Sequence, residues 1–276
     1  MLHPLLCSQF RSFVSQPGVD ILVDELNDRI KDKIRNECGS MRVLDMTSPL
    51  ELSSIFTEVN ILEGVAGKQR LHIDDLLREF HSGNDLNEFE HFAFHSSSTE
   101  KVSGIDYVQQ QDKLLVLGKL GAGKTTFLKH IALQCCDRKI LPNYLPVFVA
   151  LKAFADRAES ISLLDYIIQD LGSWDIHDYE IEGLLKERRI LLLLDGLDEV
   201  RGRDLHNVNQ QIQSFTDNFH GNRFIVTCRL AAQEYVFEKF TEVEVADFNE
   251  HQIESFSRNW FFHKETPEKA ERFLER

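Results

Sequence analysis

From residue 113 onward, short aliphatic runs alternate with stretches in which apolar residues recur every three or four positions. The run at 190–194 holds five aliphatic residues in a row, which is typical of a parallel strand buried on both faces. Strands that alternate with helices predict an α/β fold of three layers, with a mostly parallel sheet between two layers of helices. The other expected strands cover 114–117, 147–151, 224–227 and 243–245, and the expected helices cover 163–171, 181–186 and 207–219.

The first hundred residues follow a different pattern and predict a smaller helical and mixed region ahead of the α/β core. Apolar residues at helical spacing predict helices within 1–38, with a break at Pro17 and Gly18 and an end near Gly39. We expect this helix pair either to bind a partner or a second copy, or to cap the rest of the chain. The second helix of the pair has an apolar stripe that comprises Ile21, Leu22, Leu26, Ile30 and Ile34.

Residues 40–99 mix short expected strands at 41–46 and 56–62 with short expected helices at 73–81 and 86–94. His91 and His95 lie four positions apart with acidic residues nearby, but interleaved phenylalanines and the lack of further ligands disfavour a metal site. A polar run at 96–99 is typical of a linker. The expected domains are therefore an N-terminal region at 1–99, a core at 100–246 and the start of a helical subdomain at 247–276.

The strand at 114–117 leads into a phosphate-binding motif. Gly118, Gly123, Lys124 and Thr125 match the pattern G-x-x-x-x-G-K-[ST], in which backbone N–H groups and a helix N-terminus converge on phosphate oxygens. Lys124 is expected to bridge the β- and γ-phosphates, and the Thr125 hydroxyl to ligate Mg²⁺. The expected nucleotide-binding residues are Gly118, Lys119, Leu120, Gly121, Ala122, Gly123, Lys124, Thr125 and Thr126.

A second polar cluster follows the aliphatic run at 190–194. Asp195 ends that strand at the sheet edge where ligands bind, and we expect it to hold Mg²⁺ through a bound water, on a strand next to the P-loop strand. Gly196 leaves room beside the phosphates. We expect Glu199 to be the catalytic base, with Asp198 as its support or as a second group on the Mg²⁺ side. The alternative is a solvated acidic turn.

A third strand, at 224–227, ends in polar residues. Thr227 and Arg229 can reach the γ-phosphate side of the same pocket, where Arg229 would sense or neutralise the phosphate charge. The alternative is a strand-end arginine paired with surface acids.

Composition narrows the function classes. The chain of 276 residues carries a net charge of −14 without a block of Lys or Arg, which disfavours nucleic-acid binding through bulk electrostatics. Five scattered cysteines without a C-x-x-C pair are typical of a reduced, cytoplasmic protein. The adjacent Cys135 and Cys136 are expected to fill the core. We find no signal-peptide pattern and no apolar run long enough to span a membrane.

The three motifs, in this order and spacing, resemble the NACHT domain of STAND-class NTPases. They are GKLGAGKTTFLKH, LLLLDGLDEV and FIVTCR, and the small Gly196 followed by two acids is similar to that family's signature. Residues 241–261 resemble the passage from the NACHT core into its first helical subdomain. Residues 48–64 resemble the segment that precedes the core in bacterial members, so the resemblance covers about 48–263.

The resemblance implies ATP or ADP with Mg²⁺ as cofactors, and a nucleotide-controlled switch as the function. An ADP form would rest, an ATP form would form homo-oligomers in response to an unknown trigger, and slow hydrolysis would reset the switch. Bacterial members resemble animal NOD-like receptors and are linked to antiphage defence. The chain ends at Arg276 without the winged-helix subdomain whose histidine holds ADP in the family, so we expect a piece of a longer protein or a short natural form.

An ordinary P-loop enzyme, such as a kinase or a standalone ATPase, is the alternative function. A kinase would need a lid and an arginine-rich acceptor site, and no such segment is visible in the sequence. A GTPase would usually carry an N/T-K-x-D strand end, and this tetrapeptide does not occur in the chain. The sequence therefore favours adenine, although some NACHT proteins are described as accepting GTP.

Overall fold

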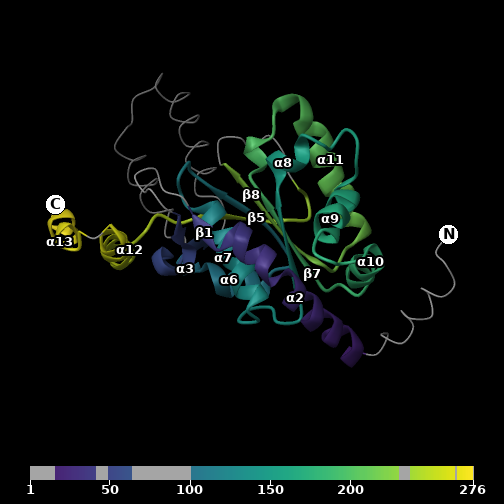
Figure 1. The fold of residues 1–276 in the computed structure, drawn as a ribbon. Helices are drawn as coiled ribbons and strands as arrows, with labels where there is room; N and C mark the ends of the chain where they lie inside the picture. Colours follow the sequence, from purple (N-terminus) through teal and green to yellow (C-terminus); the bar gives the residue numbers. More distant parts are fainter. Residues whose placement is uncertain (1–15, 42–48, 64–100, 230–236, 265, 276) are drawn as a thin grey trace, which may run out of the picture.

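A seven-stranded sheet forms the centre of the protein in the computed structural model (Figure 1). The structure describes residues 16–41, 49–63, 101–229, 237–264 and 266–275. Across the sheet, the strand order is β4 (Lys101–Ser103), β3 (Asn60–Glu63), β9 (Thr241–Val245), β5 (Lys113–Gly118), β8 (Arg223–Arg229), β7 (Ile190–Asp195) and β6 (Leu145–Ala150).

The strands from β9 to β6 run parallel to one another, whereas β3 runs antiparallel to both β9 and β4. Helix α7 (Lys124–Cys136) covers one face of the sheet. The opposite face carries α8 (Leu151–Ala155), α9 (Leu163–Gly172), α10 (Asp178–Lys186) and α11 (Gly202–Asn218), as right-handed crossovers require (Figure 1). The predicted three-layer α/β fold with a mostly parallel sheet is confirmed.

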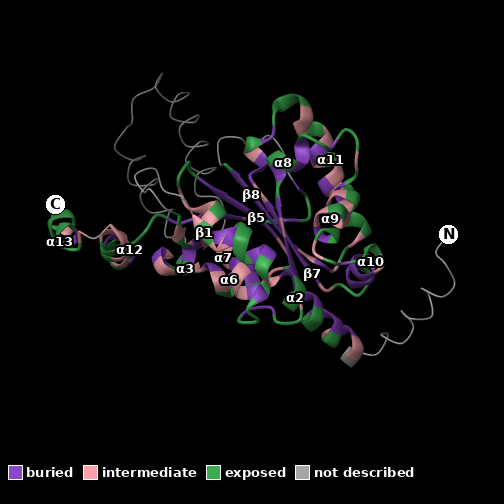
Figure 2. Ribbon diagram, viewed as in Figure 1, coloured by how far each residue is buried: buried purple, intermediate pink, exposed green. Residues whose placement is uncertain are grey.

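The central strands are buried along almost their whole length (Figure 2). Leu191, Leu192, Leu193 and Leu194 of β7 have no exposed surface, as the aliphatic run predicted. The strand predicted at 147–151 starts two residues earlier and ends one residue earlier, because Leu145 and Pro146 belong to β6 and Leu151 begins α8. This rigid sheet fixes the positions of the loops at its carboxyl edge.

Helix α2 (Gln16–Cys38) packs against α7 on the same face of the sheet. The break predicted at Pro17 and Gly18 is wrong, because these residues form the first turn of α2, where a proline costs no hydrogen bond. The predicted apolar stripe lies in the core except for Ile21, which is 54% exposed. Its buried members are Leu22, Leu26, Ile30 and Ile34.

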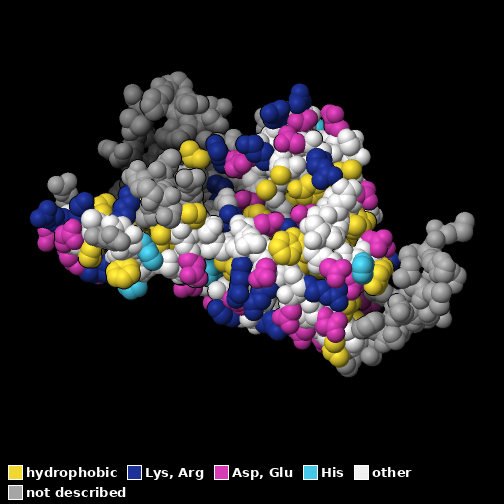
Figure 3. Space-filling view, in the orientation of Figure 1, with side chains coloured by type: hydrophobic (Ala, Val, Ile, Leu, Met, Phe, Trp, Pro, Cys, Tyr) yellow, Lys and Arg dark blue, Asp and Glu magenta, His cyan; other side chains and the backbone are white. Residues whose placement is uncertain are grey.

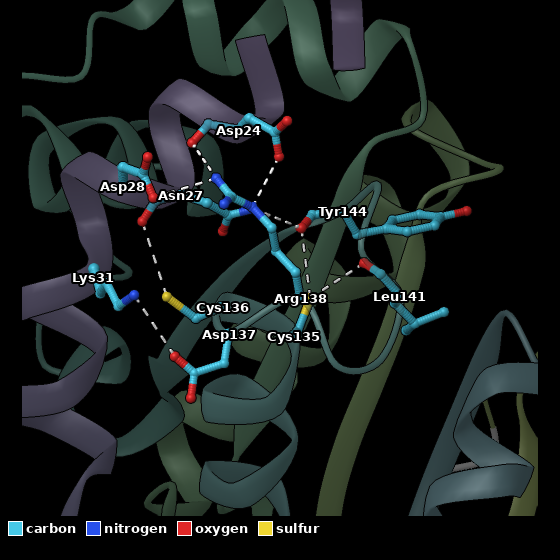
Figure 4. A network of polar contacts seen from close by, with 10 residues as sticks. All are labelled: Asp24, Asn27, Asp28, Lys31, Cys135, Cys136, Asp137, Arg138, Leu141 and Tyr144. Carbon is cyan, nitrogen blue, oxygen red and sulfur yellow. Dashed lines mark hydrogen bonds and ion pairs between the residues drawn. The ribbon is translucent and has the colours of Figure 1, made fainter. Parts of the chain in front are cut away.

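Polar contacts join α2 to the C-terminal end of α7 (Figure 4). Arg138 reaches Asp24 at 2.8 Å and Asp28 at 3.2 Å on α2. Cys135 and Cys136 are buried beneath these contacts and free, so the prediction that they fill the core is confirmed. The described part of the N-terminal region therefore packs as a cap on the α/β core, which agrees with the second of the two alternatives.

Residues 40–63 also join the core. A two-stranded sheet pairs β1 (Ser40–Met41) with β2 (Leu50–Glu51), and α3 (Leu52–Ile55) follows. Strand β3 begins four residues later than the strand predicted at 56–62 and ends one residue later, at Glu63. Because β3 pairs with β9, the main sheet contains residues from both sides of the domain boundary predicted after residue 99. The expected helices at 73–81 and 86–94, His91, His95 and the run at 96–99 lie outside the described residues.

Two helices follow the sheet and lie away from α9 and α10 (Figure 1). Helix α12 (Glu250–His263) begins at a capping box between Asn249 and Gln252, and α13 (Glu268–Leu274) packs on it. Within the part of the chain that the structure describes, no helix is both long and apolar enough to cross a membrane.

Candidate functional site

The loop between β5 and α7 curls as the phosphate-binding motif requires. Gly121 and Gly123 have φ values of +78° and +87°, in the left-handed region that favours glycine. The N–H of Phe127 donates to the carbonyl of Gly123 at 2.8 Å, so the first helical turn begins directly at the loop. The backbone N–H groups ahead of this turn have no partner within the helix and are suited to bind an anion.

Lys124 is the first residue of α7, and its side chain reaches back to the loop. Its Nζ donates hydrogen bonds to the carbonyl oxygens of Gly118 and Lys119, both at 2.9 Å. Burial lowers the pKa of Lys124, and the negative charge of Asp198 opposes this shift. Phosphate oxygens are stronger acceptors for an ammonium group than neutral carbonyls, so a phosphate entering the loop can take over Nζ from them.

The strand order brings a third strand into the site. The prediction that the P-loop strand and the Asp195 strand are neighbours is wrong, because β8 lies between β5 and β7. In register, Gly118 of β5 lies beside Arg229 of β8, and Val116 lies beside Thr227. The end of β8 therefore lies between the phosphate loop and Asp195, which the order of strands along the chain does not reveal.

Asp195 connects three elements at this edge. Its Oδ1 accepts a hydrogen bond from Thr227 Oγ1 at 2.7 Å and lies 3.2 Å from Thr125 Oγ1 on α7. The N–H of Gly196 donates to Thr227 Oγ1 at 2.8 Å, so the buried threonine bridges β8 and the end of β7. The structure thus brings together Thr125 and Asp195, the two residues expected to hold the metal.

These two side chains fit a magnesium ion. A hydroxyl and a carboxylate oxygen are hard ligands, and Mg²⁺ commonly combines one or two such protein groups with phosphates and waters. Among the described residues, no group of three or more His, Cys, Asp or Glu side chains is arranged to hold a metal. A site built from Thr125 and Asp195 would therefore depend on a nucleotide for its remaining ligands.

Asp198 and Arg229 form an ion pair beside this site. Arg229 Nε lies 2.7 Å from Asp198 Oδ2, and the Arg229 backbone N–H donates to Asp198 Oδ1 at 3.0 Å. The Asp198 side chain is 6% exposed, whereas that of Arg229 is 45% exposed. Arg229 thus pairs with an acid, as one alternative predicted, but this acid belongs to the site and is nearly buried. The guanidinium is exposed enough to exchange partners.

Glu199 lies in the one-turn helix η1 (Leu197–Glu199), and its side chain is exposed. Gly196, which precedes η1, has a φ of +78° and lies close to the glutamate, so a Cβ at this position would be 3.3 Å from Glu199 Cδ. Glycine at position 196 therefore meets two demands, the left-handed backbone and the close approach of Glu199. The carboxylate can reach solvent, as a base that activates water must.

One contact at the site was missed by the sequence interpretation. Lys119 Nζ lies 3.0 Å from Asp247 Oδ2, just after β9. No motif marks Asp247, and only the pairing of β5 with β9 brings it to the loop. Figure 3 shows acidic and basic side chains intermixed over the face that it draws.

A parallel sheet, a lysine-bearing glycine loop before a helix, and an aspartate at the end of a nearby buried strand together define a P-loop NTPase. The family model of the NACHT domain matches residues 112–264. This match covers more than half of the chain, and the protein therefore belongs to the NACHT family of nucleotide-binding NTPases. The resemblance given by the three motifs is confirmed.

Comparison with solved structures gives more distant similarities. PCH-2 from C. elegans is 13% identical, with a TM-score of 0.37 over 58% of this chain and 44% of that one. Domain III of the replication initiation protein DnaA from Thermotoga maritima is 14% identical, with a TM-score of 0.39 over 58% of this chain and 65% of that one. Both matches span less than two thirds of the other chain.

A chain from the HORMA:CdnC:Trip13 complex of E. coli MS115-1 is 17% identical, with a TM-score of 0.35 over 80% of this chain and 82% of that one. A search of curated proteins found no match.

Proposed function

We propose that the protein is a signalling switch of the STAND class that binds ATP with Mg²⁺, hydrolyses it slowly, and forms homo-oligomers in the ATP state. The observation that carries this proposal is the ion pair between Arg229 and Asp198, next to the phosphate loop. An arginine that is held by a site carboxylate and is half exposed can exchange that partner for a γ-phosphate. Such an exchange gives the site two arrangements that differ by one phosphate group.

Each residue has a proposed part in this switch. The loop from Gly118 to Thr126 binds the phosphates, and Lys124 neutralises the β- and γ-phosphate charge. Thr125 would ligate Mg²⁺ and Asp195 would hold it through a bound water, and the ion would neutralise phosphate charge when bound. Glu199 accepts a proton from the attacking water, and Asp198 supports it and positions Arg229.

The proposed setting follows the family resemblance. We expect adenine nucleotides, a cytoplasmic location and a role in bacterial antiphage defence, with a trigger that the residues do not identify. Four described cysteines are free and buried, as expected in a reducing compartment. The competing function is a turnover ATPase or kinase, which would release its product rapidly.

The proposal is tested by measuring the mass of the chain in solution with Mg²⁺ and either ADP or a non-hydrolysable ATP analogue. We expect a monomer with ADP and a larger assembly with the analogue, and we expect Arg229→Ala to bind nucleotide but respond equally to both. Arg201→Ala is the matched control, since it removes an exposed arginine outside the ion pair. Identical masses with both nucleotides would contradict the proposal.

A further inference from the structure

Lys119 and Asp247 meet where two neighbouring strands end. Strands β5 and β9 are parallel neighbours, and their last registered pair joins Leu117 with Glu244. A Cβ placed on Gly118 would lie 3.4 Å from the Cβ of Val245, so the segments that follow β5 and β9 leave the sheet in close contact. Lys119 begins the phosphate loop, whereas Asp247 lies on the short segment that leads to α12.

Lys119 makes contacts at both of its ends. Its carbonyl oxygen accepts hydrogen bonds from Lys124 Nζ at 2.9 Å and from the Ala122 N–H at 3.2 Å, inside the phosphate loop. Its side-chain Nζ donates to both carboxylate oxygens of Asp247, at 3.0 and 3.3 Å. A change in what Lys124 binds therefore removes a donor from the same residue that holds Asp247.

Asp247 is tied in turn to the start of α12. Its carbonyl oxygen accepts a hydrogen bond from Lys101 Nζ at 3.0 Å. The N-cap residue of α12, Asn249, follows two positions later, and the Gln252 side chain of the capping box also donates to the carbonyl of Glu58. Asp247 therefore lies two backbone positions before the N-cap of α12, and a displacement of Asp247 would act on the first turn of the helix through this short segment.

The pair between Lys119 and Asp247 contributes little to stability. The two side chains are 56% and 79% exposed, and ion pairs in water at such exposure are weak. Its loss is therefore expected to leave the fold and the nucleotide affinity almost unchanged.

We propose that Lys119 is a positioning residue that transmits phosphate binding in the loop to α12 through Asp247. This inference rests on the proposed function, in which a nucleotide occupies the loop. When phosphate takes Lys124 away from the Lys119 carbonyl, Lys119 shifts, and the ion pair moves Asp247 and the start of α12 with it.

Trp260 on α12 provides the measurement. The chain has two tryptophans, so Trp174→Phe leaves Trp260 as the only tryptophan, stacked on Phe256 with ring centroids 5.7 Å apart, and it is excited at a wavelength that tyrosine does not absorb. Emission is recorded with Mg²⁺ and ADP, and with Mg²⁺ and a non-hydrolysable ATP analogue. In parallel, calorimetry gives the Kd of each nucleotide. We expect the emission of the parent to change on binding, and Asp247→Ala to lose most of that change while its Kd values stay within about threefold.

Two further variants separate the ion pair from a general effect on α12. Asp247→Glu keeps the carboxylate and is expected to restore the response. Glu250→Ala removes a nearby carboxylate, in the first turn of α12, and is expected to leave the response intact. A parent that binds nucleotide without any change in Trp260 emission, or an Asp247→Ala response equal to the parent's, overturns the inference alone. A parent that binds no nucleotide overturns the proposed function as well.

Discussion

The two ends of α7 are built for opposite purposes. At the N-terminal end, Lys124 and Thr125 make polar contacts that a ligand can replace, next to glycines in left-handed conformations. At the C-terminal end, Cys135 and Cys136 are buried beneath α2, and Arg138 is bound to two acids of that helix. One end is anchored so that the other can change partners without moving the whole helix.

The anchored end of α7 joins the N-terminal helix α2 to the core of the nucleotide domain. Leu26, Ile30 and Ile34 of α2 are almost completely buried in the same core as the P-loop helix. Burying such side chains contributes about 1.5–3 kcal/mol each, far more than an exposed ion pair contributes. We therefore expect changes at the two ends of α7 to affect different quantities, binding at one end and stability at the other.

The largest effect is expected for Lys124→Ala. This change removes a partly buried cation that is proposed to face two phosphates, and nucleotide affinity should fall by about a thousandfold or more. Calorimetry with Mg²⁺ and ATP measures it, and thermal unfolding without nucleotide should be nearly unchanged. An affinity within about twofold of the parent would contradict the assignment of the loop.

The anchored end is tested by Ile30→Ala. Ile30 has no exposed surface, so its truncation should lower the free energy of unfolding by about 3 kcal/mol, as measured by urea denaturation. Ile21→Ala on the same helix is the matched control, because Ile21 is 54% exposed and should cost less than about 1 kcal/mol. Equal effects at the two positions would show that α2 does not pack on α7 as described.

Glu199→Gln should separate binding from hydrolysis. The amide keeps the shape of the side chain but cannot accept a proton, so the single-turnover hydrolysis rate should fall by about a hundredfold while ATP still binds. Asp198→Asn is the companion variant, which should change the rate less if Asp198 only supports the base. An unchanged rate in Glu199→Gln would move the role of base to another residue.

A smaller effect is expected from pH at the side of α7. Burial, and to a lesser extent Lys139, lowers the pKa of His130 from 6.5 to about 4. Because the folded pKa is the lower one, the unfolded chain binds more protons between these values, and stability is lost as the pH falls through this window. Between pH 7 and pH 5 the parent should lose about 2 kcal/mol more than His130→Gln. Parallel pH profiles in urea denaturation would contradict this cause.

The sequence was sufficient for the parts of the site that follow one another along the chain. The glycine loop, Lys124 and Thr125 form one motif, and Asp195 ends an aliphatic run that is typical of a buried strand. Arg229 was found because it ends another buried strand. Such features are local, and local spacing determines them.

Features that depend on which strands become neighbours could not be predicted in the same way. The position of β8 between β5 and β7 makes Thr227 the bridge to Asp195, and the pairing of β5 with β9 brings Asp247 to Lys119. Likewise, the apolar stripe of α2 indicated that the helix buries one face, but a stripe does not identify the surface that covers it.

The central claim is that the protein keeps its nucleotide and hydrolyses it slowly. It is tested by mixing the chain with an equimolar amount of labelled ATP and Mg²⁺, removing free nucleotide on a desalting column, and following the bound label with time. We predict that nucleotide stays bound and is converted to retained ADP at less than about one turnover per minute. A protein that elutes empty and turns over ATP many times a minute would contradict the account and identify a turnover enzyme.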